Sequence, residues 1–217
     1  GLSSGEWTAL HMAGALSFED TLRVLQARGR FMQEACEQNP GGMISVIGLD
    51  RAKLDEVCAN SGAEVANLNS PEQTVLSGSR EAVAEAQRRA EAAGARKVIP
   101  LNVAGAFHSS LMKPAADRLA DLLQHMTFRP TSMPVVSNVT ARPHGGPDEI
   151  RETMVRQVTG SVRWYEGVQW MQQHGVSRYV ECGPGRVLSG LVKRIDKQAE
   201  LHNICDLPSL KATAGKL

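Results

Sequence analysis

Gly1-Leu2-Ser3-Ser4-Gly5 begins the chain and leads directly into residues that favour a helix. The pattern G-x-S-x-G is typical of a sharp turn between a strand and a helix of an α/β sheet, and it exposes the central serine as a nucleophile. The first N–H groups of the helix and the positive end of its dipole would then stabilise an oxyanion at Ser3. This stretch predicts an α/β fold with Ser3 as the candidate nucleophile. Taken alone it is a weak signal, because glycine and serine are common in ordinary loops.

The place of this turn at the start of the chain is also informative. A preceding strand normally holds the strained backbone of such a turn, but neither a strand nor an initiator methionine precedes Gly1. We therefore expect the 217 residues to be the C-terminal part of a longer domain. We also expect the chain by itself to be inactive and poorly soluble. The alternative is a chain that naturally begins here with an unsupported turn.

The composition indicates a globular protein without a strong net charge. Hydrophobic residues make up 42% of the chain, and 24 Lys and Arg residues stand against 23 Asp and Glu residues. This balance gives no bulk attraction to nucleic acid or to an anionic membrane, so neither is expected as a partner. No apolar run approaches the roughly 20 residues that span a bilayer, although a targeting segment would lie upstream of the residues seen here.

The four cysteines predict neither a metal site nor a disulfide framework. They show no C-x-x-C spacing, and no histidine stands at a metal-ligand spacing from them. Reduced thiols in the cytoplasm are the simpler interpretation. The cysteines are Cys36, Cys58, Cys182 and Cys205.

The middle of the chain predicts an inserted subdomain. Asn39-Pro40-Gly41-Gly42 is the strongest break in the first half, and beyond it the hydrophobic pattern changes. The order strand, helix, strand, strand, helix, strand indicates a compact ferredoxin-like unit over residues 41–102. Its expected elements are strands 43–49, 64–69, 73–77 and 97–103 and helices 51–61 and 80–93.

The remaining residues, 1–40 and 103–217, predict the core of the protein. Strands that alternate with helices favour a mainly parallel sheet covered by helices on both faces. The expected helices are 6–13, 18–37, 110–125, 148–158, 164–174 and 187–195, and the expected strands are 134–139 and 179–182.

A serine nucleophile needs a base, and His108 is the best candidate among six histidines. It lies in the loop Gly105-Ala106-Phe107-His108-Ser109-Ser110 that leaves a strand, where the active-site residues of α/β proteins gather. The other histidines are expected to be inert, because they lie within a helix, near helix ends, in a Gly/Pro loop or in the tail. These are His11, His125, His144, His174 and His202.

Several segments, taken in order, strongly resemble the malonyl-CoA:acyl-carrier-protein transacylases. The resemblance extends from Gly1 to about Pro208, and several motifs in one order are far more specific than a single turn. It implies an α/β-hydrolase-like acyltransferase core with a βαββαβ insertion between nucleophile and base. The segments are the opening turn with Glu6, Ala27-Arg28-Gly29-Arg30-Phe31-Met32-Gln33-Glu34-Ala35, Asn69-Ser70-Pro71, the loop of His108, Leu111-Met112-Lys113-Pro114 and Glu181-Cys182-Gly183-Pro184-Gly185.

The resemblance implies a role for four side chains or backbone groups. The acyl-enzyme forms on Ser3, His108 is the base, and the backbone carbonyl of Gln157 orients that base. Arg28 binds the malonyl carboxylate, since a guanidinium can pair with both carboxylate oxygens. Without the resemblance, Arg28 would be taken for half of a surface ion pair and Gln157 for an ordinary polar helix residue.

The resemblance also implies an oxyanion hole and a selective pocket. The backbone N–H of Ser4 would bind the oxyanion together with a Gly-Gln-Gly loop that the family carries upstream. Leu2 and Ser4 depart from the family's usual His and Leu, and the Ser4 hydroxyl is an alternative nucleophile or a competitor for His108. Phe107 beside the base would crowd a branched acyl group and so favour malonyl over methylmalonyl, unless it only packs in the core.

The expected activity is that of an acyltransferase enzyme of fatty-acid biosynthesis, with malonyl-CoA and acyl carrier protein as its partners. No metal or redox cofactor is implied. The acyltransferase of a polyketide synthase shares these motifs and is an alternative. An esterase-type hydrolase would need an acidic partner for its base and would leave Arg28 without a task.

Two further alternatives concern binding. An inactive fragment would bind carrier protein or coenzyme A without turnover. A basic cluster, Arg186, Lys193 and Arg194, would meet an acidic carrier protein or the phosphates of coenzyme A, or is only a solvated helix face.

Overall fold

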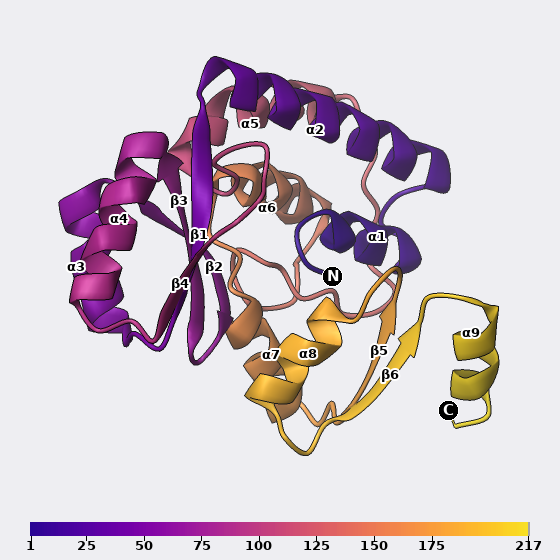
Figure 1. Cartoon of the computed structure of the whole chain (residues 1–217). Coiled ribbons are helices and arrows are strands. Elements are labelled where there is room, and N and C mark those ends of the chain that lie inside the picture. Colours follow the sequence, from indigo (N-terminus) through magenta and orange to yellow (C-terminus); the bar gives the residue numbers. More distant parts are fainter. Residues whose placement is uncertain (217) are drawn as a thin grey trace.

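The serine turn leads into two helices that pack against each other. In the computed structural model, which describes residues 1–216, α1 (Ser4–Met12) begins directly after the turn and is followed by the long helix α2 (Phe18–Gln38) (Figure 1). The side-chain oxygen of Ser17 accepts a hydrogen bond from the N–H of Asp20 at 3.0 Å, which satisfies a donor at the start of α2. The cap stabilises the first turn of α2, the helix on which α1 packs.

The middle of the chain forms an antiparallel sheet. The elements follow in the order β1 (Gly41–Ile47), α3 (Arg51–Ser61), β2 (Glu64–Ser70), β3 (Gln73–Ser79), α4 (Arg80–Ala92) and β4 (Lys97–Pro100). The strands lie in the order β2-β3-β1-β4, and each neighbouring pair is antiparallel. This agrees with the ferredoxin-like order that the sequence predicts.

The two faces of this sheet have different neighbours. One face and the helices α3 and α4, which lie together on it, enclose an aliphatic cluster (Figure 1). The other face contributes Met43, Ala66 and Val75, which pack with Leu101 and Phe107. The sheet thus presents apolar side chains to the loop that carries His108. The aliphatic cluster is Ile44, Val46, Leu49, Leu54, Val57, Ala63, Leu76, Ala86 and Ala90.

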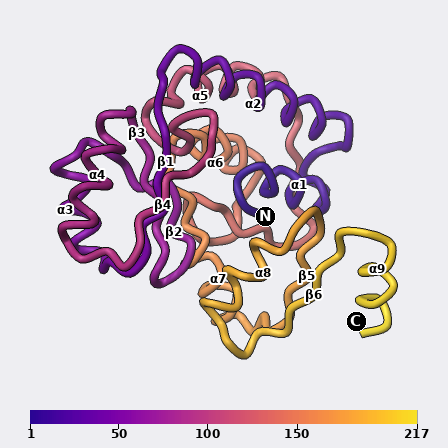
Figure 2. Tube along the Cα trace, viewed as in Figure 1, coloured from indigo at the N-terminus to yellow at the C-terminus, as the bar shows by residue number. Residues whose placement is uncertain are grey.

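After β4 the chain returns to the first helices. Figure 2 shows the segment after residue 100 running back beside α2, although the two are far apart in sequence. The returning elements are a short 3-10 turn η1 (Ser110–Met112), α5 (Lys113–Gln124) and α6 (Pro147–Thr159). Helix α5 packs on both α2 and α6, and their apolar sides form the largest hydrophobic cluster of the described residues with α1. Because the cluster includes Trp7 and Leu10 of α1, it supports the helix that follows the serine turn.

The C-terminal part lies below α1 in Figure 1 and packs beside the edge of the antiparallel sheet. Strands β5 and β6 pair in parallel, joined by a helix. Helix α7 and helix α8 both contact β2, and α8 lines the same cavity as Ser3. The elements are α7 (Trp164–Gln173), β5 (Arg178–Cys182), α8 (Val187–Ile195), β6 (Glu200–Ile204) and α9 (Leu207–Ala214).

The mainly parallel sheet expected from the sequence is not confirmed. Within residues 1–216, only β5 and β6 are parallel, and the four-stranded sheet is antiparallel. The expected strand 134–139 does not form, because the chain there makes only one bridge, between Val136 and Pro143. Pro134 and Pro143 have no N–H to donate to a ladder. The α/β class itself is confirmed.

The division of the chain into two domains, residues 41–102 and the flanking segments 1–40 and 103–217, stays a prediction.

Among the described helices, none is both long and apolar enough to cross a membrane.

Candidate active site

The serine turn has the strained backbone that its sequence pattern predicts. Ser3 has a φ of 51° and a ψ of −106°, in the region where residues other than glycine are rare. The N–H of Gly5 donates to the oxygen of Leu2 at 2.9 Å, which closes the turn. A side chain at Gly1 would overlap the carbonyl group of Gly5, so glycine is required there. The turn therefore projects the Ser3 hydroxyl from the start of α1.

His108 lies against the Ser3 hydroxyl and is held from its other side. Its Nε2 is 3.0 Å from Ser3 Oγ, and its Nδ1 is 2.8 Å from the backbone oxygen of Gln157 on α6. Because a carbonyl only accepts hydrogen bonds, Nδ1 carries the proton and Nε2 offers its lone pair to the serine. His108 also has a positive φ of 56°, which aims its ring out of the loop between β4 and η1. The pair is arranged for proton transfer from Ser3 to His108.

The surroundings of His108 keep it neutral at pH 7. Burial and the positive charge of Arg28 lower its pKa from 6.5 to about 4, against smaller contributions from backbone carbonyls such as that of Gln157. Only about 5% of the residue is exposed. An uncharged imidazole beside Ser3 can accept a proton, whereas a protonated one cannot.

Arg28 reaches the same hydroxyl from α2. Its Nη2 donates to Ser3 Oγ at 2.8 Å and to the side-chain oxygen of Gln157 at 3.2 Å. Burial lowers its pKa to about 10, so the guanidinium is still charged at pH 7. It is only 7% exposed and forms no ion pair with any carboxylate in the described part of the chain, so it is not half of a surface ion pair. Its Nε has no hydrogen-bond partner among the described residues and remains available to an anionic ligand.

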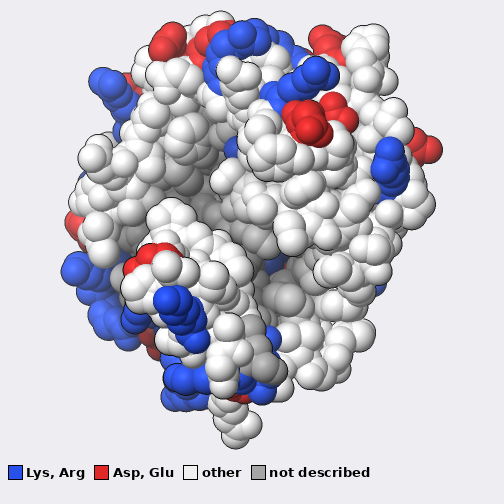
Figure 3. Space-filling model, turned by 90° about the vertical axis from the view of Figure 1, so that its right-hand side faces the viewer, with Lys and Arg blue, Asp and Glu red and all other residues white. Residues whose placement is uncertain are grey.

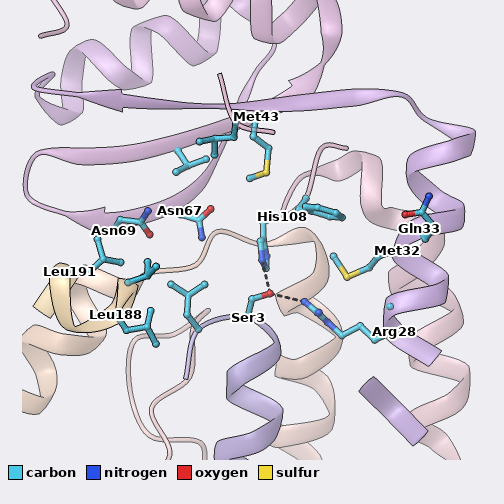
Figure 4. A pocket seen from close by; sticks show the side chains of 16 residues that line it. Ser3, Arg28, Met32, Gln33, Met43, Asn67, Asn69, His108, Leu188 and Leu191 are labelled. Carbon is cyan, nitrogen blue, oxygen red and sulfur yellow. Dashed lines mark hydrogen bonds between the residues drawn. The ribbon is translucent and has the colours of Figure 1, made fainter. Parts of the chain in front are cut away.

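A cavity of about 520 Å³ opens over these three residues. Figure 4 shows the side chains of His108 and Arg28 pointing at the Ser3 hydroxyl from two different directions, His108 from above and Arg28 from the right. The walls come from α2, α8 and the sheet face that carries Met43 and Asn67, and they are mostly apolar. An open pocket with mostly apolar walls and a few convergent polar groups is typical of a ligand-binding site.

The two other predicted residues lie next to this arrangement. Ser4 is exposed, is not among the residues around the cavity, and makes no hydrogen bond to His108, which contacts Ser3 instead. Its backbone N–H is at the start of α1, where no carbonyl lies four residues back. Phe107 is half-buried, lines the cavity and also packs on the apolar side of the sheet. Phe107 therefore both faces the cavity and takes part in apolar packing, and its effect on the choice of acyl group stays a prediction.

Glu6 and His144 form a buried pair that the sequence does not predict. His144 Nε2 is 2.7 Å from Glu6 Oε1, and both side chains are fully buried. Asn138 adds two contacts, because its Oδ1 accepts from the N–H of Ser3 at 2.6 Å and its own N–H donates to Glu6 at 3.1 Å. His144 is thus a structural partner of Glu6 and not a freely solvated loop histidine.

The three residues of the predicted basic cluster are exposed but lie at opposite ends of α8, with Arg186 before its first turn and Lys193 and Arg194 in its last turn. Arg194 Nη1 donates to Gln73 Oε1 at 3.0 Å, and Lys193 Nζ donates to the backbone oxygen of Lys197 at 2.6 Å. Leu188 and Leu191, earlier on the same helix, line the cavity. Figure 3 shows a hollow on this side of the molecule with Lys and Arg side chains gathered below it. Lys193 and Arg194 are exposed and therefore accessible to an anionic partner.

Comparison with known proteins gives a consistent family. The sequence profile described as "Acyl transferase domain" matches residues 1–212. The malonyl CoA-acyl carrier protein transacylase of Escherichia coli (strain K12) is 44% identical over 199 residues, which cover 90% of this chain and 64% of that protein. The protein of the same name from Staphylococcus aureus (strain MRSA252) is 37% identical over 216 residues, 97% of this chain and 70% of that protein. The chain therefore spans about 64% of the length of the Escherichia coli relative.

Solved structures of malonyl transacylases are also similar to this chain. The malonyl CoA-acyl carrier protein transacylase from Coxiella burnetii has a TM-score of 0.95 at 37% identity, over all of this chain and 70% of its own. A malonyl-transacylase solved in complex with a type II polyketide synthase acyl-carrier protein has a TM-score of 0.94 at 38% identity, over 98% of this chain and 70% of its own.

Proposed function

The chain belongs to the acyl transferase domain family, and on this premise we propose that it transfers the malonyl group of malonyl-CoA to the phosphopantetheine thiol of an acyl carrier protein. The observation that carries the proposal is the hydroxyl of Ser3, which lies within hydrogen-bond distance of both His108 Nε2 and Arg28 Nη2. The proposed nucleophile therefore contacts both its proposed base and the guanidinium that would bind the malonyl carboxylate. An esterase would need the first two only.

In the first half of the reaction Ser3 takes the malonyl group. The Oγ–H proton moves to His108 Nε2 as the oxygen attacks the thioester carbonyl, which gives a tetrahedral oxyanion. The carbon–sulfur bond then breaks, and the sulfur of coenzyme A leaves with the proton from His108. The product is a malonyl ester of Ser3.

In the second half the thiol of the carrier's phosphopantetheine reverses these steps. Its proton moves to His108, its sulfur attacks the ester carbonyl, and Ser3 Oγ leaves and regains the proton. Thioester is exchanged for thioester, so no external energy source or redox cofactor is required. We propose no metal or cofactor for the reaction.

Two negative charges need stabilisation during these steps, that of the oxyanion and that of the malonyl carboxylate. The N–H of Ser4 and the positive end of the α1 dipole stand where the oxyanion develops. Arg28 turns from Ser3 Oγ to the carboxylate of the incoming malonyl group, which it binds through two parallel N–H groups. Binding of that carboxylate also neutralises the charge that lowers the pKa of His108, so the base becomes stronger when the correct substrate is present.

The shape of the cavity favours an unbranched acyl group. Phe107 and Met32 line it beside His108 and Arg28, and a methyl branch on the malonyl carbon would meet this apolar wall. We therefore propose malonyl over methylmalonyl as the substrate.

The partners follow from the reaction. Lys193 and Arg194 are exposed on the helix whose earlier turns line the cavity, and they suit a negatively charged acyl carrier protein or the phosphates of coenzyme A. We propose no nucleic acid or membrane partner. The four cysteines of the described chain are free thiols, which supports a reducing compartment such as the cytoplasm.

The test is formation and transfer of a malonyl adduct. The protein that carries this chain is incubated with malonyl-CoA, its intact mass is measured, and holo acyl carrier protein is then added. We expect one malonyl group on the wild type, its loss to the carrier, and no adduct on Ser3→Ala, because no other hydroxyl within residues 1–216 contacts His108. An adduct that survives Ser3→Ala would refute the assigned nucleophile, and Ser4→Ala is the matched control that should keep the adduct.

A carrier protein of polyketide synthesis is the second candidate acceptor. It is favoured by the likeness to the malonyl-transacylase that was solved with a type II polyketide synthase carrier protein. The chemistry at Ser3 is the same for both acceptors. Transfer rates to a fatty-acid carrier and to a polyketide carrier, measured side by side, distinguish the two.

A further inference from the structure

A buried carboxylate without a task in the proposed reaction lies directly behind Ser3. Glu6 is on the first turn of α1 and is fully buried. His144 Nε2 at 2.7 Å and the N–H of Asn138 at 3.1 Å donate to its Oε1, and Gln157 Nε2 at 2.6 Å donates to its Oε2. A carboxylate in such a place is costly unless its lone pairs are satisfied, and here they are.

The partners of Gln157 fix the orientation of its side chain. Its Nε2 donates one hydrogen to Glu6 Oε2 and the other to the backbone oxygen of Ser3 at 2.9 Å. Both partners only accept hydrogen bonds, so the nitrogen belongs on that side. The side-chain oxygen therefore faces Arg28 Nη2, and the backbone oxygen of the same residue holds His108. One glutamine links the carboxylate to both the base and the guanidinium.

Glu6 compensates the charge of Arg28 without blocking it. Its negative charge raises the pKa of Arg28 against the larger effect of burial. A carboxylate in direct contact would occupy the guanidinium, but Glu6 acts from the far side of Gln157 and forms no ion pair with Arg28. The N–H groups of Arg28 that face the cavity stay available for a ligand.

We propose that Glu6 is a positioning residue for acyl transfer, which holds Gln157 in one orientation and through it sets both His108 and Arg28. The inference rests on the proposed function, because the base and the carboxylate clamp that it positions are those of that reaction. Glu6 itself does not touch the substrate. Through Gln157 it positions both His108 and Arg28, which contact the same oxygen, Ser3 Oγ.

Loss of the charge on Glu6 has two consequences. The charge raises the pKa of His108 while Arg28 lowers it, so Glu6→Gln leaves His108 a weaker base. The new amide also presents a nitrogen either to Gln157 Nε2 or to the N–H of Asn138, and two donors then face each other. When the nitrogen faces Gln157, the side chains of Gln157 and Arg28 lose their fixed orientation. When it faces Asn138, the hydrogen bond from the N–H of Asn138 is lost instead.

The test compares two variants of Glu6 in the protein that carries this chain. For Glu6→Gln we expect kcat/KM for malonyl-CoA to fall by about tenfold to a hundredfold. We also expect the acid limb of its pH profile to move to lower pH. Glu6→Asp keeps the charge and should leave the acid limb in place even where the rate falls. A change in the amount of folded protein alone would lower the rate without moving the limb.

The matched control is Asp196→Asn. It also replaces a buried carboxylate by an amide, but at the end of α8, where Asp196 accepts from the N–H of Gln198 at 2.9 Å. We expect its kcat/KM and its acid limb to stay within about twofold of the wild type. If Glu6→Gln does not fold, Gln157→Leu serves in its place, because it keeps the backbone oxygen and removes the link. It should reduce the preference for malonyl over acetyl groups by about tenfold.

The outcomes separate this inference from the proposed function. A wild type that forms no malonyl adduct overturns both. A wild type that transfers malonyl, together with a Glu6→Gln variant that keeps its rate and its acid limb, overturns the role of Glu6 alone. An unchanged acyl preference in Gln157→Leu does the same.

Discussion

The ferredoxin-like unit and the candidate active site are stabilised in opposite ways. The interior of the unit is a cluster of aliphatic side chains between the sheet and the helices α3 and α4. The candidate active site instead contains four buried polar residues that are joined by hydrogen bonds, namely Glu6, Arg28, His108 and Gln157. Apolar burial is non-directional, whereas each of these hydrogen bonds fixes the position of one atom against another.

This difference determines what a mutation does in each region. A residue lost from the aliphatic cluster removes part of the folding free energy and leaves the remaining geometry in place. A residue lost from the polar network releases its neighbours, because each polar group has few alternative partners. We propose, as the central claim, that Ser3, His108 and Arg28 act as one connected unit, in which Arg28 binds the carboxylate of the substrate and also lowers the pKa of the base.

The largest effect that separates the two regions is expected for Arg28→Ala. It should lower kcat/KM for malonyl-CoA by about a hundredfold and change that for acetyl-CoA by only a few fold, because two charge-assisted hydrogen bonds to the carboxylate are lost. Competition between the two thioesters, followed by intact-mass measurement of the acyl-enzyme, gives the ratio directly.

Arg28→Lys is the matched control for charge. Lysine keeps the positive charge but not the planar pair of donors, so its preference for malonyl should lie between those of the wild type and Arg28→Ala. An unchanged preference in Arg28→Ala would mean that another group binds the carboxylate.

A much smaller effect on activity is expected in the ferredoxin-like unit. Leu76 is fully buried among the aliphatic side chains that face α3 and α4, on the side of β3 away from the cavity. Leu76→Ala should lower the free energy of unfolding by about 2–4 kcal/mol, measured in urea, because it leaves a void in the core. The kcat/KM of the folded protein should stay within about threefold of the wild type. Selective loss of malonyl transfer at unchanged stability would contradict the comparison.

The sequence predicts the ferredoxin-like unit well, because its elements carry local signals. Helix α3 begins after Asp50, whose side chain accepts from the N–H of Lys53 at 2.9 Å, and it ends at Gly62 with a φ of 75°. Strand β6 and helix α9 are not predicted, since Glu200, His202 and Asn203 interrupt the apolar pattern of the strand. The isolated segment near Pro134 has apolar residues but no hydrogen-bonded partner strand in the described chain.

The candidate site is predicted in part. The motif and the family resemblance identify Ser3, His108 and Arg28, which the structure brings to one oxygen. The pairing of Glu6 with His144 could not be predicted, because the two residues are far apart in sequence and only the tertiary fold joins them. The presence of Glu6 in the motif was the only available signal.

The most direct test of the central claim is the pH dependence of the reaction of Ser3 with a neutral sulfonyl fluoride, in the wild type and in Arg28→Ala. The reagent has no carboxylate, so the rate reports the base alone. The pKa of His108 is lowered by burial and by Arg28, so the wild-type rate should stay on its plateau well below pH 6.5 and fall to half near pH 4. In Arg28→Ala the midpoint should move to higher pH, because a charge that disfavours protonation is gone. A wild-type midpoint at 6.5 or above, or the same midpoint in both proteins, would contradict the account.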